Sequence, residues 1–162
     1  MKKYKLLKRD FIEVGGIKLY RIQATTSFGN VTKGDLGGYI QKRGNLSEEG
    51  NAWVSGDAQV YDNAQVSGNA RVSGDALIYG NARVYGNARV TQKLQIYDGS
   101  RHTASLFKDK DGVWCVIVGC QYHTLAEWET LLVQVAKANN YTPSQITEYQ
   151  HAFQFFKNLT TV

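Results

Sequence analysis

A six-residue repeat runs through the middle of the chain and constrains its fold more than any other feature. A β-branched residue recurs every six positions without a break, at Val54, Val60, Val66, Val72, Ile78, Val84, Val90 and Ile96. Two positions before these stand Ala52, Ala58, Ala64, Ala70, Ala76, Ala82, Ala88 and Leu94. A turn pair such as Gly68-Asn69 precedes most of the alanines. Such a period is the signature of a repeat architecture.

Each hexad reads as a short strand followed by a bend. Side chains alternate along a strand, so the alanine and the β-branched residue point to the same, inner face. Gly with Asn or Asp tolerates the backbone angles of the bend. Three such strands make a triangular coil, so the pattern predicts a left-handed parallel β-helix of hexapeptide repeats over residues 51–97. It lies within a segment, 36–100, whose irregular first coil continues the alanine register backwards through Leu46 and Ile40.

The outside of the predicted coils carries the residues that we expect to bind a partner. Residues eighteen positions apart should lie above one another there. The resulting columns are Trp53, Arg71 and Arg89; Tyr61, Tyr79 and Tyr97; and Arg83 with Tyr85. Tyr, Trp and Arg are enriched at the energetic centres of protein interfaces. The plainer interpretation is that these are ordinary strand-favouring surface residues.

The segment before the repeat, residues 1–35, reads as a β-hairpin. Apolar residues alternate on either side of a turn at Gly15-Gly16, which is the pattern of two antiparallel strands. A repeat body must cover the apolar ends of its coils. We therefore expect this hairpin to cap the first coil.

The segment after the repeat, residues 101–162, changes character partway along. A second hairpin is predicted, turning between residues 108 and 112. The period then becomes helical, with a capping box at Thr124 and Glu127 and a second helix starting at Thr142-Pro143. The expected fold is mainly β, with an α-helical hairpin at its C-terminal end.

Positive charge is concentrated at the N-terminal end. The chain has a net charge of +5, but residues 1–45 carry ten Lys or Arg against three acids, whereas residues 46–100 carry four against six. A nucleotide or nucleic-acid partner would therefore depend on the N-terminal segment. No apolar run is long enough to span a membrane, and the basic start lacks the apolar core of a signal peptide. We expect a soluble cytoplasmic protein.

No catalytic arrangement stands out. Acyltransferases built on this repeat use a histidine and coenzyme A, but His102, His123 and His151 all lie outside the regular coils, and no long loop interrupts them. Cys120 and His123 have the spacing of a metal-ligand pair, yet a zinc site usually has a second close pair. Cys115 and Cys120 are expected to be reduced. We expect no enzyme activity, no cofactor and no metal.

Motifs outside the hexads are more specific, namely Gly34-Asp-Leu-Gly-Gly-Tyr-Ile40 and Val118-Gly-Cys-Gln-Tyr-His-Thr-Leu-Ala-Glu-Trp128. With the Gly-Asn/Asp-Ala-x-Val hexads, they make nearly the whole chain resemble small hexapeptide-repeat proteins of bacteriophages and prophages, related to bacterial hexapeptide-repeat transferases. The resemblance implies an accessory binding protein in the host cytoplasm that inhibits a host defence factor, by binding a host protein or by sequestering a nucleotide or nucleic acid.

Two other functions fit the same fold, because a fold does not determine a function. One is an acyl- or nucleotidyltransferase of the hexapeptide-repeat type. The other is a structural, self-assembling protein. A homotrimer or a dimer is expected by analogy with other left-handed β-helices.

Overall fold

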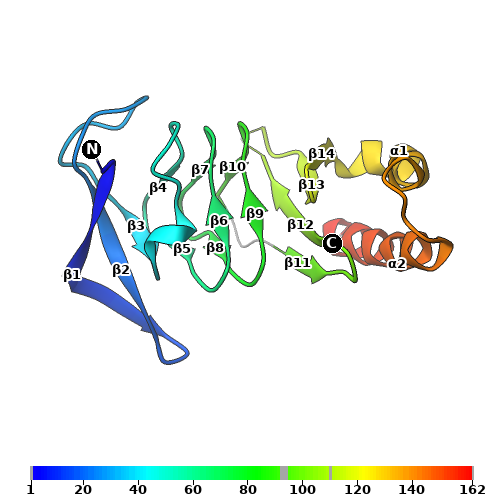
Figure 1. The fold of residues 1–162 in the computed structure, drawn as a ribbon, viewed down its shortest axis with the longest axis horizontal. Helices are drawn as coiled ribbons and strands as arrows, with labels where there is room; N and C mark the ends of the chain where they lie inside the picture. Colours follow the sequence, from blue (N-terminus) through cyan, green and yellow to red (C-terminus); the bar gives the residue numbers. More distant parts are fainter. Residues whose placement is uncertain (1, 92–94, 110, 162) are drawn as a thin grey trace. The chain divides into compact units, whose positions relative to one another are not determined.

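A computed structural model describes residues 2–91, 95–109 and 111–161 (Figure 1). The chain is mainly β, with two helices at its C-terminal end, and it divides into two compact units, residues 1–94 and 95–162. The first unit contains β1 (Tyr4–Val14), β2 (Ile17–Ala24), β3 (Leu36–Ile40), the 3-10 helix η1 (Arg43–Asn45), β4 (Trp53–Val54), β5 (Gln59–Val60), β6 (Gln65–Val66), β7 (Arg71–Val72), β8 (Leu77–Ile78), β9 (Arg83–Val84) and β10 (Arg89–Val90).

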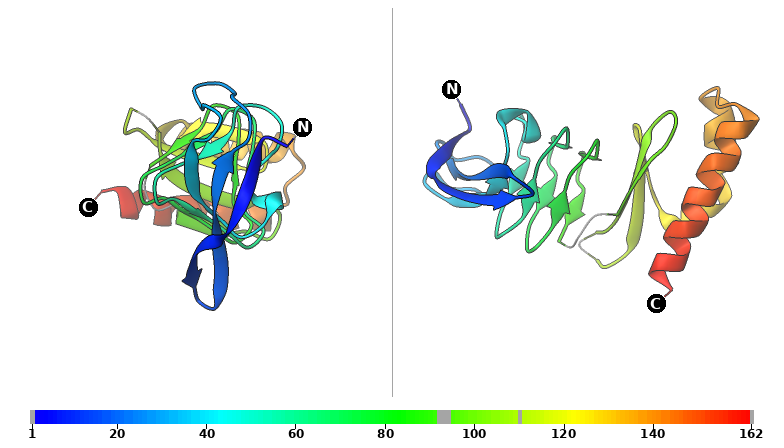
Figure 2. Two further views of the ribbon diagram at one scale, coloured as in Figure 1. Left: turned by 90° about the vertical axis from the view of Figure 1, so that its left-hand side faces the viewer. Right: turned by 90° about the horizontal axis from the view of Figure 1, so that it is seen from below.

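The predicted N-terminal hairpin is present, and it belongs to the same sheet as some strands of the repeat. Strands β1 and β2 pair antiparallel around a turn in which Gly15 and Gly16 have φ of 55° and 82°. β2 pairs antiparallel with β3, which in turn pairs in parallel with β5. The hairpin tip extends past the outline of the coils (Figure 2, left). The hairpin thus shares its hydrogen bonding with the coils, whereas the sequence placed a boundary at residue 35.

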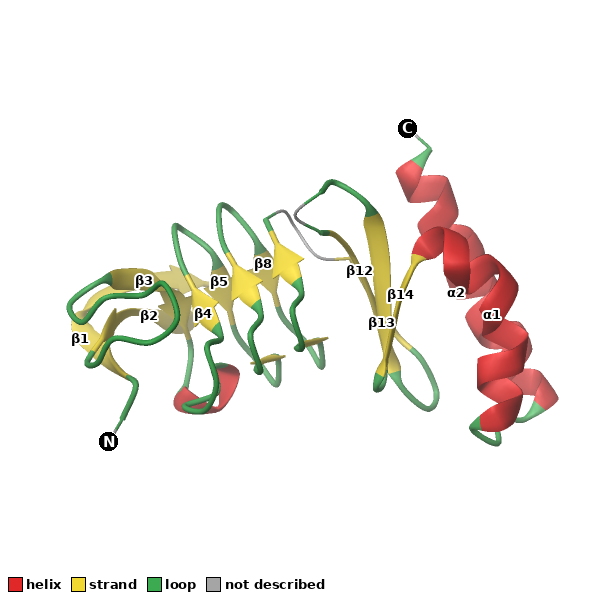
Figure 3. Cartoon of the chain, turned by 90° about the horizontal axis from the view of Figure 1, so that it is seen from above, coloured by secondary structure: helices red, strands yellow, loops and turns green. Residues whose placement is uncertain are grey.

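Within the repeat, strands eighteen residues apart pair in parallel (Figure 3). They form small sheets in the orders β10-β7-β4, β6-β9 and, within a mixed sheet, β1-β2-β3-β5-β8. Backbone amides of one coil donate to carbonyls of the next, as from Arg71 N to Ala88 O at 2.8 Å. The predicted inward residues from Ala52 to Val90 are all buried, which confirms their register.

The irregular first coil has a different register from the predicted one. Ile40 pairs with Val60, and Leu46 forms a bridge with Val66. Both therefore align with valines, and the prediction that they continue the alanine register is wrong. The physical reason is that Leu46 and Val54 are eight positions apart, whereas their partners Val66 and Val72 are six apart, so two extra residues lie in the corner after Leu46.

Two glycines of the Gly34–Ile40 motif are explained by close packing around β3. A Cβ atom on Gly37 would lie 2.4 Å from Cγ1 of Ile22, and one on Gly38 would lie 2.5 Å from the carbonyl oxygen of Ala58. Both distances are far below van der Waals contact. Because β3 lies between β2 and β5, only glycine fits at these two positions.

The last predicted hexad does not belong to the coils. Its strand, β11 (Gln95–Asp98), pairs antiparallel with β12 (Thr103–Lys108), with Ile96 opposite Ser105. Leu94, the other inward residue of this hexad, lies outside the described residues. Alternation specifies the face of a side chain but not the direction of the neighbouring strand, so the sequence extended the coil too far.

The second unit is a four-stranded antiparallel sheet with two helices. It contains β11, β12 (Thr103–Lys108), β13 (Trp114–Val118), β14 (Gln121–Thr124), α1 (Leu125–Ala138) and α2 (Pro143–Thr160). The capping box predicted at Thr124 is present, the second helix starts at Pro143 as predicted, and Thr142 forms a further capping box with Gln145. Between helices and sheet lies a core of Ala104, Leu106, Val116, Val118, Leu125, Trp128, Tyr149, Phe153 and Phe156. No helix in the described residues is long and apolar enough to cross a membrane.

Candidate binding surfaces

The first predicted column, Trp53, Arg71 and Arg89, lies in register on β4, β7 and β10. Trp53, however, is only 4% exposed. The ring of Phe28 contacts it edge-on, with 5.5 Å between ring centroids. The expectation that Trp53 contacts a partner is therefore wrong, because its side chain already contributes to the core.

The loop between β2 and β3 covers this end of the column. Phe28 and Val31 form a β-bridge within it, and the Lys3 ammonium lies 4.9 Å from the centroid of the Phe28 ring. A Cβ atom on Gly29 would lie 2.9 Å from Nη2 of Arg71, so the loop backbone rests on that guanidinium. Burial, with the neighbouring Arg89, lowers the pKa of Arg71. Of the three residues of the column, only Arg89 is exposed.

Two of the three residues of the second column lie as predicted. Tyr61 and Tyr79 stack, with ring centroids 5.6 Å apart and an interplanar angle of 14°, and both remain partly exposed. Burial, followed by the nearby Tyr79 and Asp62, raises the pKa of Tyr61. Tyr97, the third predicted member, belongs to β11 in the second unit. Its hydroxyl donates to Oε1 of Glu148 at 3.0 Å.

The third column borders a polar groove of about 330 Å³. Its lining includes Lys42, Asn63, Gln65, Asn81 and Arg83. Nδ2 of Asn63 donates to Oδ1 of Asn81 at 3.4 Å, and the Lys42 ammonium lies 3.5 Å from Oδ1 of Asn63. Within the described residues, Arg83 has no carboxylate partner. The volume is within the range of ligand sites, roughly 300–1,000 Å³.

The hexad pattern did not predict that the residues of this groove lie close together. Lys42 belongs to the irregular first coil, whose register the hexad pattern mispredicts. Asn63 and Asn81 are corner residues, and their place one above the other follows from the eighteen-residue coil. Tyr85, the remaining member of the predicted column, is half-buried and lies one position beyond β9.

A further cationic and aromatic surface lies on the hairpin. The Lys8 ammonium lies 4.0 Å from the centroid of the Tyr20 ring, and that of Lys18 lies 4.4 Å from the centroid of Phe11. Phe11 is 40% exposed. The basic composition of residues 1–45 indicated the charge of this segment, but not its combination with exposed rings.

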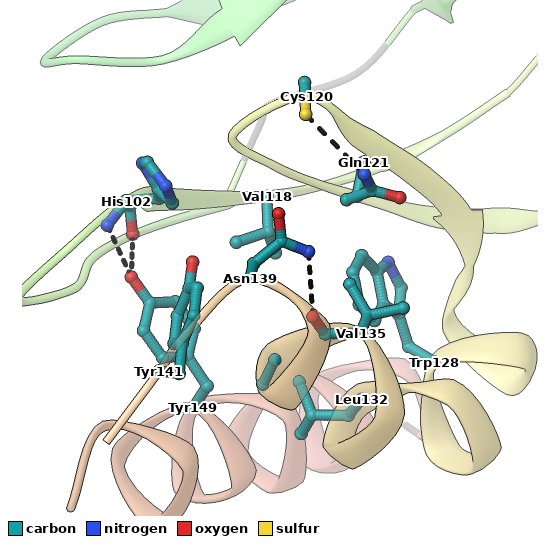
Figure 4. A pocket seen from close by; sticks show the side chains of 11 residues that line it. His102, Val118, Cys120, Gln121, Trp128, Leu132, Val135, Asn139, Tyr141 and Tyr149 are labelled. Carbon is teal, nitrogen blue, oxygen red and sulfur yellow. Dashed lines mark hydrogen bonds between the residues drawn. The ribbon is translucent and has the colours of Figure 1, made fainter.

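In the second unit, a small cavity lies among α1, the start of α2 and the sheet (Figure 4). Trp128, Leu132 and Val135 form its apolar lining, while His102 and Tyr141 contribute polar groups. Its volume of about 40 Å³ admits little more than water, since ligand sites measure roughly 300–1,000 Å³. This cavity is too small to serve as a substrate pocket in this conformation.

The candidate metal pair takes no part in a ligand cluster. Cys120 is exposed at the turn before β14, and Nε2 of Gln121 lies 3.6 Å from its sulfur. The ring of His123 instead contacts Trp128 edge-on, with centroids 5.0 Å apart. Among the described residues, no group of three His, Cys, Asp or Glu side chains is placed to hold a metal ion. Cys115 and Cys120 are free thiols.

Comparison with known proteins agrees with the repeat architecture. The family model for the YdcK β-solenoid repeat matches residues 64–80, 76–92 and 82–98. No curated protein matches the chain significantly. The matches lie on the hexads and the strand that follows them, so they support a repeat β-solenoid in this part of the chain and do not extend to its flanking segments.

Proposed function

We propose that this chain is a non-enzymatic binding protein that contacts its partner at one corner of its coils. The observation that carries the proposal is the parallel stack of Tyr61 on Tyr79, two residues before the groove residues Asn63 and Asn81. The stack restrains both rings before a partner arrives, so little side-chain entropy is lost on binding. Arg83, which has no carboxylate partner in the part of the chain that the structure describes, adds positive charge to the adjoining face.

For the fold itself, we infer a left-handed parallel β-helix of hexapeptide repeats. Parallel pairing at eighteen residues, with three strands in each coil, supports this assignment. Such coils have flat faces that suit binding to a partner or to further copies of the chain. A homotrimer or dimer is part of the same proposal.

For the partner, we propose a host protein with an acidic surface. Tyr and Arg are the residue types that dominate the energetics of protein interfaces, and Lys42 and Arg83 supply positive charge beside the tyrosine stack. The resemblance to phage and prophage proteins favours an accessory protein that inhibits a host defence factor in the host cytoplasm.

The part of the proposal that excludes enzyme activity is based on the placement of the histidines. His102, His123 and His151 all belong to the second unit, whereas hexapeptide-repeat acyltransferases place a histidine on the coils. The cavity that His102 borders is small.

The proposal is tested with the purified chain as bait in a lysate of its host, followed by affinity measurement with the purified captured protein. The double variants Tyr61→Ala/Tyr79→Ala and Lys42→Glu/Arg83→Glu should each weaken binding by at least about tenfold, which corresponds to about 1.4 kcal/mol. The matched control is Arg89→Glu, which reverses an exposed arginine on another face. If both double variants bind as tightly as the control, the proposed corner is not the binding surface.

A further inference from the structure

The hairpin of the first unit contains a large bulge that exposes cations. Leu6 pairs with Ile22 and Phe11 pairs with Tyr20, so four residues of β1, 7–10, lie opposite Arg21 alone. Bulges of this kind redirect side chains and are often found at functional sites. Here the bulge places Lys8 and Arg9 on the surface.

The same surface presents two aromatic rings. Phe11 and Tyr20 lie opposite each other across the two strands, with centroids 6.2 Å apart in an edge-to-face arrangement. Lys18 lies over the first ring and Lys8 over the second. We call Lys8, Arg9, Phe11, Lys18 and Tyr20 the hairpin patch.

The charge around the hairpin patch is strongly positive. Residues 1–24 contain seven Lys or Arg and two acids. Both acids are paired, Asp10 with Arg21 at 3.4 Å and Glu13 with Lys18 at 3.8 Å. Within the described residues, Lys8 and Arg9 have no carboxylate partner, so they are available to an anion.

Protection of the edge strand explains only part of this arrangement. β1 is at the edge of its sheet, and lysines on an edge strand prevent pairing with other chains. That role would not require the exposed ring of Phe11 or a bulge that brings Lys8 onto Tyr20. Alternating cations and exposed rings are the composition of sites for single-stranded nucleic acid.

We propose that the hairpin patch binds single-stranded nucleic acid, as a second surface separate from the coil corner. Bases would stack on Phe11 and Tyr20, taking the places of the two ammonium groups. The displaced Lys8 would contact the phosphates together with Arg9. Single-stranded DNA and RNA both offer base faces and phosphodiesters, so either can be the ligand.

The test measures fluorescence anisotropy of labelled oligothymidylate and oligouridylate of about 12 nucleotides at about 50 and about 200 mM salt. Lys8→Gln/Arg9→Gln should weaken binding at least tenfold and reduce the salt slope by about 1.4, since each of the two phosphate contacts contributes roughly 0.7. Phe11→Leu should weaken binding about 5- to 100-fold and leave the slope unchanged. Binding to at least one of the two oligonucleotides with these losses supports the proposal.

Two controls separate stacking from simple charge attraction. A duplex of the same length hides its base faces and should bind more weakly than the single strand. Arg83→Gln removes an exposed arginine from the coil corner and should leave oligonucleotide affinity unchanged, which keeps this test independent of the proposed protein partner. Equal affinity for the duplex, an equal loss in Arg83→Gln, or no binding of either oligonucleotide would each overturn the proposal.

Discussion

The ring of Tyr61 lies parallel to that of Tyr79, one coil away, with 5.6 Å between their centroids. Strands β5 and β8 hold Gln59 opposite Leu77, so the residues just beyond the strands are also held in register. The corners repeat this relationship with amides, since Nδ2 of Asn69 donates to Oδ1 of Asn87 at 3.2 Å. Side chains on the outside of the coils thus form ladders along the coil axis.

The tyrosine stack should contribute measurably to stability. Tyr61→Ala and Tyr79→Ala are each expected to destabilise the chain, with a coupling energy of about 0.5–1.5 kcal/mol in a double-mutant cycle, the usual strength of an aromatic pair. Urea denaturation of the four proteins measures it. A cycle that combines Tyr61→Ala with Arg89→Ala, on another face, should give no coupling. Coupling near zero for the tyrosines would mean that the rings do not stack in solution.

Replacing a corner glycine by alanine should cost an amount of stability that depends on which atoms lie near the added Cβ. Gly50 and Gly86 both have positive φ, of 67° and 64°. Alanine in this conformation costs about 1–2 kcal/mol, which is all we expect for Gly86→Ala, since no described atom lies within 4 Å of the added Cβ. At Gly50 the Cβ would lie 2.5 Å from the carbonyl oxygen of Gly68.

Gly50→Ala should therefore cost at least about 1 kcal/mol more than Gly86→Ala, as overpacking usually does. Chemical denaturation of the two variants provides the comparison. Equal losses would show that neighbouring coils separate at the corner without cost.

Replacing Asn45 by aspartate, which has nearly the same shape, should destabilise the folded chain. It is fully buried, and its Nδ2 donates to the carbonyl oxygens of Asp62 at 3.2 Å and Ala64 at 2.8 Å. Asn45→Asp would place a carboxylate against these acceptors, with an expected loss of at least about 2 kcal/mol at pH 7. Protonation returns one donor, so the loss should be smaller at pH 4. Asn69→Asp, in an exposed amide ladder, serves as control and should cost less.

Much of the coil could be predicted from the sequence because each hexad determines its own inner face. The stack of Tyr61 on Tyr79 followed directly from the coil length. The burial of Trp53 did not, since periodicity identifies an outward side chain but not the loop that covers it. The bulge at residues 7–10 could not be predicted either, because it depends on how β1 pairs with β2 rather than on alternation within either strand.

Lys3 is a buried cation that should make stability depend on pH. It is 4% exposed, and its ammonium donates to the carbonyl oxygen of Ala52 at 3.0 Å. Burial lowers its pKa from 10.5 to about 8, against the opposing effect of Glu48. Between these two values the unfolded chain binds a proton that the folded chain has lost. The free energy of unfolding should therefore rise with pH in this window, by up to about 1.4 kcal/mol per pH unit.

Above about pH 10 the buried Tyr4 acts in the opposite direction, because burial raises its pKa and the folded chain then retains the extra proton. The contribution of Lys3 is isolated by comparing wild type with Lys3→Met, in urea denaturation between about pH 7 and about pH 9.5. The stability of wild type relative to Lys3→Met should increase as the pH rises, whereas Lys5→Met, which removes an exposed lysine two residues further along the chain, should parallel wild type. If wild type and Lys3→Met remain parallel across this range, the Lys3 ammonium is not desolvated in the folded chain.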